Sequence, residues 1–417
     1  MEGSIVAPPS KSYTHRAVIA SALSDGKSEL IDPLISDDIL ATIKACQSLG
    51  VLIEKKGNHL VINGAHELAA PNKPLDCGDS ASTMRFMTPV TALVRGTTVL
   101  TGSYGLLKRP VGPLIDSLIP LGVHCTSNAG FPPVVVYGGG IEGGKTSLVG
   151  DMSSQFITGL LLSSPLARKN TEIKLTTRLE SRPYVDLSLH IIEKHGITVR
   201  VSEDYRKYSV SGLQVYAPCN HKVIGDFSSA AFLIAAALVS NSHVKVTNLN
   251  TQLKNQPDLE FLNILKKMGV KMQVKNDSVE VLEGNLEAIE IDAQNIPDLI
   301  PIIATIACYA VGTTRITNAE RLRIKESDRL ASTASELKKM GADVLEMKDG
   351  LTVKGPCILK GTTINPHNDH RIAMASAVAA IGAEGKTTIF NAECVNKSYP
   401  DFFKDLGTLG VSVNTVS

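Results

Sequence analysis

Ser48-Leu49-Gly50-Val51 ends a helical pattern near the start of the chain, and the same short signature ends five later patterns. In each copy a glycine follows the apolar periodicity of a helix and precedes a small or branched apolar residue. The later copies are Pro120-Leu121-Gly122-Val123, Lys194-His195-Gly196-Ile197, Lys267-Met268-Gly269-Val270, Lys339-Met340-Gly341-Ala342 and Thr408-Leu409-Gly410-Val411. The six glycines lie 69 to 74 residues apart. A period this regular predicts one folding unit that is repeated six times.

The third copy shows the elements of this unit most clearly. Alternating apolar residues predict strands, apolar residues at helical spacing predict helices, and Gly196 is expected to end the second helix at its C′ position. The elements are expected at residues 145–149, 153–167, 171–178, 182–196, 197–203 and 207–213. The fourth copy repeats the pattern at residues 228–240, 243–249, 257–268, 270–276 and 278–283. The predicted unit is therefore β-α-β-α-β-β.

The first and last copies indicate how the chain closes. Residues 3–7 form a strand pattern ahead of the first copy, and the last copy has room for only one strand, at residues 411–417. The simplest closure joins these two segments. We therefore expect an α/β fold made of α+β repeats, with six units in two domains of three. One domain would contain residues 10–225, and the other would contain residues 1–9 plus residues 226–417.

The composition excludes several classes of function. The chain of 417 residues is long enough for about two domains, and its net charge of +1 provides no basic surface for nucleic acid. Aromatic residues make up 4% of the chain, which leaves few platforms for stacking bases. The seven cysteines are scattered singly, which is typical of reduced, cytoplasmic thiols. No signal peptide is predicted, and the apolar runs at 228–239 and 299–311 are too short to span a bilayer.

Cations near the starts of helices are the first functional signal. Each copy begins with a capping segment, and the free N–H groups of a helix N-terminus attract anions. Lys11, Arg16, Arg85 and Arg371 place positive charge in the first turns of three such helices. Because the helix dipole disfavours a cation there, folding alone does not explain them, and we expect anionic ligands. Asp226, by contrast, is expected to be only a cap.

The densest group of charges is the segment Arg321-Leu322-Arg323-Ile324-Lys325-Glu326-Ser327-Asp328-Arg329. A solvated helix face is the usual explanation of such a run, but Lys325 and Arg329 would then be like charges at i, i+4. Glu326 beside Lys325 is a candidate proton carrier next to a cation. Clustered cations in a chain of near-zero net charge favour binding of small polyanions. No third ligand stands at metal spacing near His367 and His370, so no metal site is predicted.

Ten stretches in this chain resemble the 5-enolpyruvylshikimate-3-phosphate (EPSP) synthase family, and they follow the order of the family from residue 8 to residue 401. The first five are Pro9-Ser10-Lys11-Ser12-Tyr13-Thr14-His15-Arg16, Asp76-Cys77-Gly78-Asp79-Ser80-Ala81-Ser82-Thr83-Met84-Arg85, Lys108-Arg109-Pro110-Val111-Gly112-Pro113-Leu114, Ser153-Ser154-Gln155-Phe156 and Ser181-Arg182-Pro183-Tyr184. The other five are Gly225-Asp226-Phe227-Ser228-Ser229-Ala230, Ile296-Pro297-Asp298, Arg323-Ile324-Lys325-Glu326-Ser327-Asp328-Arg329-Leu330, Asn368-Asp369-His370-Arg371-Ile372-Ala373-Met374 and Lys397-Ser398-Tyr399-Pro400-Asp401.

The resemblance implies both a fold and a reaction. The implied fold is six β-α-β-α-β-β units in two domains, with the active site in the interdomain cleft. The implied reaction transfers the enolpyruvyl (1-carboxyvinyl) group of phosphoenolpyruvate to the 5-hydroxyl of shikimate 3-phosphate and releases phosphate. It belongs to the shikimate pathway to chorismate and aromatic amino acids. No cofactor and no metal are expected, and we expect a cytoplasmic monomer that binds neither nucleic acid nor membrane.

The resemblance also implies which residues act. Asp298 would accept the hydroxyl proton, and Glu326, with Lys11, would protonate the methylene carbon. Shikimate 3-phosphate would be held by Lys11, Ser12, Arg16, Ser153, Ser154, Gln155, Ser181, Tyr184, Asp298 and Lys325. Phosphoenolpyruvate would be held by Lys11, Ala81, Arg85, Arg109, Gln155, Arg329, Arg371 and Lys397.

Three positions depart from the family pattern. Asp79 replaces a usual Asn, and a carboxylate there is compatible with phosphoenolpyruvate only if it turns away as a cap. Ala81 stands where Gly is common, and its methyl group would project toward the pocket of phosphoenolpyruvate. We therefore expect reduced sensitivity to glyphosate, the inhibitor of the family that occupies that pocket. Arg321 stands where many members have Asn, and no role is transferred to it.

Three alternatives remain at this stage. The sister enzyme that moves enolpyruvyl onto UDP-N-acetylglucosamine typically carries a reactive Cys before the Arg-Pro pair, whereas residues 101–107 contain no Cys. An RNA 3′-phosphate cyclase is built from related units, but the chain lacks a basic stripe and has few aromatic residues. A repeat scaffold without catalytic activity would not need Asp298, Glu326 and the matching cations.

Overall fold

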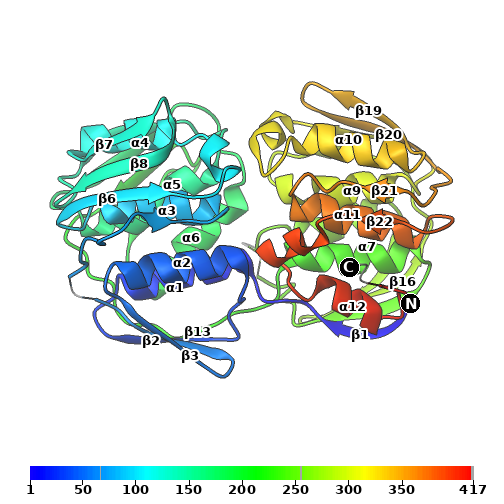
Figure 1. Cartoon of the computed structure of the whole chain (residues 1–417), viewed down its shortest axis with the longest axis horizontal. Helices are drawn as coiled ribbons and strands as arrows, with labels where there is room; N and C mark the ends of the chain where they lie inside the picture. Colours follow the sequence, from blue (N-terminus) through cyan, green and yellow to red (C-terminus); the bar gives the residue numbers. More distant parts are fainter. Residues whose placement is uncertain (66, 254–255, 415–417) are drawn as a thin grey trace. The chain divides into compact units, whose positions relative to one another are not determined.

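The computed structural model describes residues 1–65, 67–253 and 256–414. The protein divides into two compact units (Figure 1). The chain begins in one unit, passes through the whole of the other and then returns to the first. The continuous unit is Pro9–Val223, and the discontinuous unit combines Met1–Pro8 with Ile224–Ser417. The chain therefore passes from one unit to the other at residues 8–9 and again at residues 223–224.

The continuous unit contains three four-stranded sheets in the part of the chain that the structure describes. Their strands are β2 (Lys27–Ile31), β3 (Leu52–Lys56), β4 (His59–Asn63), β5 (Leu75–Asp76), β6 (Gly96–Thr101), β7 (His124–Asn128), β8 (Phe131–Gly138), β9 (Gly144–Leu148), β10 (Thr171–Leu175), β11 (Val199–Val201), β12 (Lys207–Val210) and β13 (His221–Lys222). Its helices are α1 (Lys11–Ala22), α2 (Asp37–Ser48), α3 (Ala81–Thr91), α4 (Gly112–Leu118), α5 (Ser154–Ser163) and α6 (Arg182–Lys194), with 3-10 turns η1 (Leu106–Lys108), η2 (Ile119–Leu121) and η3 (Ser164–Leu166).

The discontinuous unit has two four-stranded sheets and one two-stranded sheet among its described residues. Its strands are β1 (Glu2–Val6), β14 (His243–Thr247), β15 (Val270–Val274), β16 (Val279–Gly284), β17 (Glu290–Asp292), β18 (Gly312–Thr317), β19 (Asp343–Met347), β20 (Gly350–Gly355), β21 (Thr363–Ile364) and β22 (Thr388–Ile389). Its helices are α7 (Phe227–Val239), α8 (Glu260–Lys267), α9 (Ile300–Ala307), α10 (Arg329–Lys339), α11 (His370–Ile381) and α12 (Phe402–Thr408), with 3-10 turns η4 (Pro297–Leu299), η5 (Glu320–Ile324) and η6 (Ala392–Lys397).

The predicted β-α-β-α-β-β unit is confirmed, and its sheet has one recurring order. In the third copy the order is β9-β10-β12-β11, with β9 parallel to β10 and the hairpin strands antiparallel. The second and fifth copies have the equivalent orders β5-β6-β8-β7 and β17-β18-β20-β19. The sixth copy keeps only the parallel pair β21-β22, which agrees with its truncated sequence. In the second, third and fifth copies both helices connect strands of one sheet.

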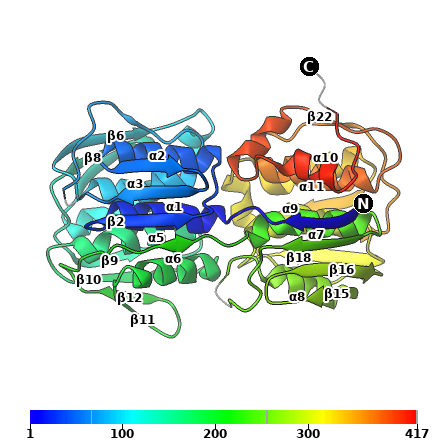
Figure 2. The ribbon, with the colours of Figure 1, turned by 90° about the horizontal axis from the view of Figure 1, so that it is seen from below.

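The first and fourth copies obtain their outer strand from a distant part of the sequence. The order of the first sheet is β13-β2-β4-β3, so residues 221–222 complete the sheet of the first copy. The order of the fourth sheet is β1-β14-β16-β15, and β1 pairs in parallel with β14 from Glu2 and His243 onward. Figure 2 shows β1, in dark blue, among the green elements of the fourth copy. The two outer strands are thus exchanged between the two units.

This exchange corrects the predicted closure. We expected the N-terminal strand to join a strand at residues 411–417, but β1 pairs with β14 instead. Residues 411–414 form no strand, and residues 415–417 lie outside the described part of the chain. The N–H of Glu2 in β1 donates to the carbonyl of Leu409, in the last copy, at 3.3 Å. The physical reason is that the edge of β14 provides parallel hydrogen-bonding partners along the whole of β1. An alternating apolar pattern, such as that of residues 411–417, does not specify which strand it pairs with.

All six signature glycines end a helix in the left-handed conformation. Their φ angles are +94° (Gly50), +83° (Gly122), +82° (Gly196), +89° (Gly269), +93° (Gly341) and +93° (Gly410). In five copies the N–H of the next residue donates to a carbonyl five residues back, as Val51 does to Cys46 and Ile197 to Ile192. This is the Schellman pattern, and residues with a Cβ are strained in this conformation. The repeating glycine thus has a local structural cause.

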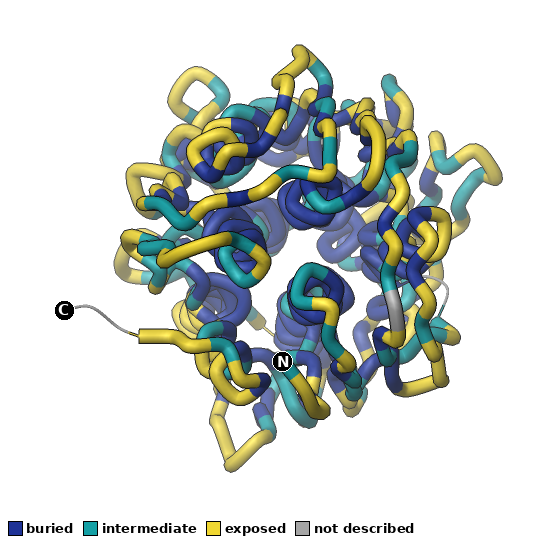
Figure 3. Tube along the Cα trace, turned by 90° about the vertical axis from the view of Figure 1, so that its right-hand side faces the viewer, coloured by how far each residue is buried: buried dark blue, intermediate teal, exposed yellow. Residues whose placement is uncertain are grey.

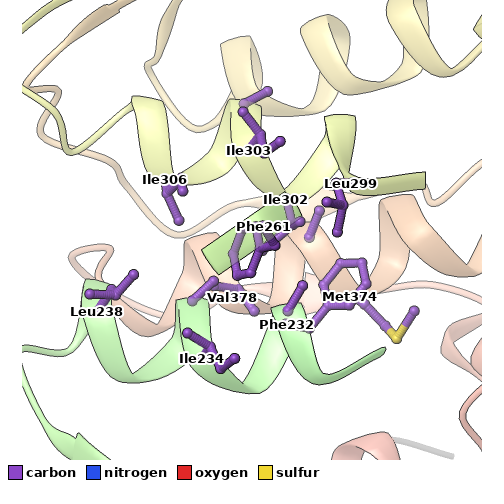
Figure 4. Close-up of a cluster of buried hydrophobic side chains, with 14 of the residues drawn as sticks. Phe232, Ile234, Leu238, Phe261, Leu299, Ile302, Ile303, Ile306, Met374 and Val378 are labelled. Atoms are coloured by element: carbon purple, nitrogen blue, oxygen red, sulfur yellow. The ribbon is translucent and has the colours of Figure 1, made fainter. Parts of the chain in front are cut away.

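Each unit has its own hydrophobic core. In the discontinuous unit α7, α9 and α11 contact one another, and Figure 4 shows Phe232 of α7, Phe261 of α8, Ile302 of α9 and Met374 of α11 packed together. Figure 3 shows these buried helices inside more exposed loops. The apolar run at 228–239 is therefore a buried core helix. No helix in the described part of the chain is long and apolar enough to cross a membrane.

Candidate active site

The most densely charged site of the discontinuous unit is centred on Arg329, the first residue of α10. Its Nη1 donates to Asp298 Oδ1 at 2.7 Å, its Nη2 to Glu326 Oε2 at 2.6 Å and its Nε to Asp369 Oδ2 at 2.8 Å. The guanidinium is buried, with 1% of its side chain exposed. A single buried arginine therefore holds together both predicted proton carriers and a third carboxylate. We call these four residues the Arg329 cluster.

A second arginine shares Asp298. Arg371 Nη2 donates to Asp298 Oδ2 at 3.1 Å, and its Nη1 donates to the backbone carbonyl of the same residue at 3.2 Å. Burial alone would raise the pKa of Asp298, but the charges of Arg371 and Arg329 outweigh it and hold this pKa well below its ordinary value. Asp298 is thus a firmly ionised carboxylate between two cations.

Local sequence explains how these side chains converge. Asp369 caps α11 by accepting from the N–H of Arg371 at 2.9 Å, so its second oxygen is left to face Arg329. Asp328 caps α10 through the N–H of Ala331 at 3.1 Å, which fixes the first turn that carries Arg329. Because η5 ends at Ile324, Lys325 and Arg329 do not stand on one continuous helix. The like-charge conflict that a continuous helix would create is therefore avoided.

Lys325 and Lys397 extend the positive charge of this unit. Burial, together with the charges of Arg321 and Arg329, lowers the pKa of Lys325 to about 7 against the opposing charge of Asp298. Lys397 is buried at the end of η6, which packs against α11. Arg321 instead donates to the backbone carbonyl of Gln294, which agrees with the absence of a ligand role for it. Anions bound here would meet several partly desolvated cations.

Asp258 is a residue that the sequence did not indicate. It is 1% exposed, has a φ of +62° and accepts a short hydrogen bond from Ser228 Oγ. Burial and the charge of Asp298 raise its pKa to about 7, against the opposing charge of Arg371. The Ser228 carbonyl in turn accepts from Arg371 Nη1 at 3.4 Å. The left-handed backbone of Asp258 could not be foreseen from the sequence Gln256-Pro257-Asp258, and no recognisable motif marks this residue.

Asp226 behaves as predicted at the start of α7. Its Oδ1 accepts from the N–H of Ser228 at 3.0 Å, which is the contact of an N-cap residue. Among the described residues no group of three His, Cys, Asp or Glu side chains is placed to hold a metal ion.

In the continuous unit, Arg85 brings together three predicted motifs. Its Nη1 donates to Gln155 Oε1 at 2.9 Å and to Ser153 Oγ at 3.2 Å, and its Nη2 donates to the carbonyl of Pro110 at 2.8 Å. Pro110 follows Arg109, which is 6% exposed. Arg85 thus joins the start of α5 to the segment that carries Arg109. Gln155 Nε2 also donates to Ser82 Oγ at 2.9 Å, which adds the first turn of α3.

Arg16 lies at the junction of α1, α5 and α6. Its guanidinium donates to Ser188 Oγ at 2.8 Å, to Ser12 O at 2.9 Å, to Tyr184 O at 3.1 Å and to Thr158 Oγ1 at 3.3 Å. These contacts use four of its five N–H donors. Arg16 therefore places the N-terminal turn of α1, with Lys11 and Ser12, against the start of α6.

Lys11 has a partner that the sequence did not identify. Its Nζ lies 2.9 Å from Asp38 Oδ2, and the two side chains are 13% and 5% exposed. Asp38 stands in the first turn of α2, where a carboxylate suits the helix dipole. The preceding motif Ser36-Asp37-Asp38 is an ordinary capping pattern, so nothing in the sequence pointed to Lys11. An incoming anion would have to compete with Asp38 for this cation.

The remaining predicted residues lie at helix starts of the continuous unit. Ser154 is the first residue of α5, and Ala81, 3% exposed, is the first residue of α3. Ser181 precedes α6 with a φ of +55°, and its carbonyl accepts from the N–H of Tyr184 at 3.0 Å. Asp79 turns toward Ser103, whose hydroxyl donates to it at 2.7 Å.

Residues 1–406 match the family described as EPSP synthase (3-phosphoshikimate 1-carboxyvinyltransferase). The chain belongs to the EPSP synthase family. The resemblance on which the sequence analysis relied is therefore confirmed, and so is the two-domain fold of the family.

Two relatives are named 3-phosphoshikimate 1-carboxyvinyltransferase. The one from Methanocaldococcus jannaschii is 42% identical over 420 residues and covers 99% of this chain and 97% of its own length. The one from Methanococcoides burtonii is 44% identical over 419 residues, with coverage of 99% and 97%. A solved EPSP synthase from Acinetobacter baumannii is 26% identical, has a TM-score of 0.82 and covers 100% of this chain and 97% of its own.

Proposed function

We propose that this member of the EPSP synthase family transfers the 1-carboxyvinyl group of phosphoenolpyruvate to the 5-hydroxyl of shikimate 3-phosphate and releases phosphate. The observation that carries the proposal is the Arg329 cluster, in which the two proton carriers required by the reaction share one buried arginine. The reaction supplies 5-enolpyruvylshikimate 3-phosphate to the shikimate pathway. Full-length relatives that bear the transferase name support the same assignment.

The substrate contacts are proposals that rest on the family motifs and on where their side chains lie. Lys11, Ser12, Arg16, Ser153, Ser154, Gln155, Ser181, Tyr184, Asp298 and Lys325 would hold shikimate 3-phosphate. Lys11, Ala81, Arg85, Arg109, Gln155, Arg329, Arg371 and Lys397 would hold phosphoenolpyruvate. The hydrogen bonds of Arg85 support its pairing with Ser153 and Gln155, and the burial of Arg109 suits a desolvated anion contact.

The reaction has two stages, an addition and an elimination, and each stage requires two proton transfers. Asp298 takes the proton of the 5-hydroxyl group of shikimate 3-phosphate as the hydroxyl oxygen attacks C2 of phosphoenolpyruvate. Glu326, with Lys11, protonates the methylene carbon. Glu326 then takes a proton from the methyl group of the tetrahedral intermediate, and Asp298 gives its proton to the departing phosphate, which restores both carboxyl groups to their starting states. General acid and base groups of this kind must lie within hydrogen-bonding reach of the reacting atoms.

The ion pairs of Arg329 suggest how binding prepares these groups. With both arginines as partners, Asp298 is a weak base, and Glu326 accepts a hydrogen bond from Arg329. Phosphoenolpyruvate brings its own negative charges to Arg329 and Arg371, so it competes with the carboxylates for those donors. Loss of these partners raises the affinity of a carboxylate for protons. Substrate binding would therefore make Asp298 a stronger base and allow Glu326 to take up the proton that it donates.

We also propose that the protein acts as a monomer in the cytoplasm. Each proposed substrate contact comes from this single chain, so the assignment needs no partner copy. The seven cysteines are free thiols, which suits a reducing compartment. Light scattering of the purified protein measures the oligomeric state directly.

One assay tests the proposed function. Phosphate release is measured with phosphoenolpyruvate plus shikimate 3-phosphate, and separately with phosphoenolpyruvate plus UDP-N-acetylglucosamine, each in the presence of a chelator. We expect phosphate only with the first pair, with no need for divalent metal. Release with UDP-N-acetylglucosamine would establish the sister activity instead. Activity that disappears in chelator and returns with magnesium would contradict the metal-free mechanism.

A further inference from the structure

Two thiols outside the candidate active site lie next to each other in the discontinuous unit. Cys308 follows the last residue of α9, and Cys357 follows β20. The N–H of Cys357 donates to the carbonyl of Cys308 at 2.7 Å, so their backbones are in direct contact. Each thiol also shifts the pKa of the other, so the two side chains interact. Residues 49 positions apart in the sequence thus form a neighbouring pair.

The two thiols differ in their exposure. Cys308 is fully buried at 0% exposure, and its Sγ donates to the carbonyl of Ala304 at 3.3 Å. Cys357 is partly exposed, and it stands between the exposed residues Pro356 and Ile358. A reagent can therefore approach Cys357 from solvent, whereas Cys308 is shielded by its burial.

The surroundings of Cys357 favour its thiolate. The neighbouring Cys308 thiol lowers the pKa of Cys357 to about 6, helped by the backbone N–H of Asp343 and opposed by burial. In its neutral form the Sγ of Cys357 donates to the carbonyl of Lys354 at 3.0 Å. The proximity of the two thiols also raises the pKa of Cys308. Asp343 and Tyr309 are titratable groups that interact with the pair. One thiolate, located on the exposed member, is therefore the favoured ionisation state near neutral pH.

We propose that Cys357 is a reactive modification site for electrophiles and peroxides, and that Cys308 is its resolving thiol. The Cys357 thiolate attacks one oxygen of hydrogen peroxide, which gives a sulfenic acid and releases hydroxide. The Cys308 thiol then attacks the sulfenic sulfur, which forms the Cys308–Cys357 disulfide and releases water. The two sulfurs lose two electrons, and peroxide gains them. A disulfide would connect the end of α9 to the segment after β20.

The first experiment uses the native protein and iodoacetamide at pH 6.5, with alkylation of each cysteine followed by mass spectrometry. Cys219 and Cys394 are also partly exposed, so they are internal references. A thiol of pKa about 6 has far more thiolate at this pH than an ordinary thiol, and its lower nucleophilicity offsets most of the gain. We expect Cys357 to react about fivefold faster than Cys219. Equal rates, or a faster Cys219, would overturn the proposal.

The second experiment treats the protein with hydrogen peroxide and maps disulfides in the digested chain. We expect the peptide pair that joins Cys308 to Cys357, and its reversal by dithiothreitol. In Cys308→Ala the resolving thiol is absent, so a dimedone probe should capture the sulfenic acid of Cys357. Cys219→Ala is the matched control and should still form the disulfide. Disulfides at other cysteines, or no oxidation of Cys357 in the native protein, would refute the role of the pair.

Discussion

Arg329 donates to Asp298 across 2.7 Å while only 1% of the arginine side chain is exposed. The same guanidinium also reaches Glu326 and Asp369, so one cation stabilises three buried or half-buried carboxylates. The charges of Arg371 and Arg329 hold the pKa of Asp298 well below its ordinary value. The two proposed proton carriers therefore share one cation.

Substitution of either proton carrier should lower kcat more than it changes KM. Asp298→Asn and Glu326→Gln keep the size of each side chain but remove its capacity to exchange a proton, so kcat should fall by about 10²–10⁴. Steady-state phosphate release measures this. Glu320→Gln is the control, because Glu320 lies in the neighbouring η5, is 63% exposed and pairs only loosely with Lys348 at 3.5 Å. A near-normal kcat for Glu326→Gln would exclude it as the proton donor.

Binding of shikimate 3-phosphate should be accompanied by proton uptake at Lys325. The pKa of Lys325 is lowered to about 7, chiefly by burial, so much of this amine is neutral at pH 8. A phosphate dianion beside it favours the ammonium form and raises its pKa. Calorimetry at pH 8 in buffers of different ionisation enthalpy counts the protons bound. We expect uptake by the native protein and a clear loss of it in Lys325→Met. Identical proton counts would place the phosphate elsewhere.

A buried histidine chain should make the continuous unit sensitive to acid. His195 Nδ1 contacts the Ala217 carbonyl at 2.7 Å, His195 Nε2 contacts His221 Nε2 at 2.9 Å, and His221 Nδ1 contacts the Tyr13 hydroxyl at 3.0 Å. Each of these three contacts can be a hydrogen bond with a single proton between its two atoms only if both imidazole rings are neutral. Burial lowers both pKa values, that of His221 to about 3.

The direction of the pH effect follows from these lowered pKa values. Unfolded histidine binds a proton near pH 6.5, whereas the folded rings do not, so their stabilisation is complete above about pH 6.5 and is lost toward pH 3. Each ring contributes a slope of up to about 1.4 kcal/mol per pH unit to the free energy of unfolding. Urea unfolding of His221→Gln between pH 7 and 5 should show a shallower slope than the native protein. His243 is exposed, so His243→Gln should keep the slope of the native protein. Equal slopes in the native protein and both variants would contradict the proposed role of His221.

Ala81 should act as a steric filter against glyphosate. Its side chain is buried at the start of α3, one turn before Arg85, and an extra methyl group in a tight site costs about 1–3 kcal/mol. In Ala81→Gly the inhibition constant for glyphosate should fall severalfold, while the KM for phosphoenolpyruvate changes less. Inhibition kinetics on the two proteins decide this. If both constants move together, Ala81 does not discriminate between the two ligands.

Parts of the candidate site could be predicted because they depend on local sequence. Ser10, Ser80, Ser153 and Asp369 cap helices as their motifs indicated, and these caps place the neighbouring cations at helix starts. The resemblance to the family supplied the proposed roles of Asp298, Glu326 and Arg329. Asp258 and Asp38 were missed, because their importance comes from contacts with Ser228 and Lys11 that no spacing encodes.

The sequence by itself determined the repeat, since each unit ends at a glycine whose left-handed conformation is a local requirement of the helix end. Only the tertiary structure decided which strands complete the sheets: β1, which precedes the first copy, joins the sheet of the fourth, and β13, which precedes the fourth copy, joins the sheet of the first. It also decided that Asp298, Glu326 and Asp369 share Arg329, and that Cys308 meets Cys357. The physical reason is that alternation and capping depend on neighbours along the chain, whereas strand pairing and ion pairing depend on partners that only packing brings together.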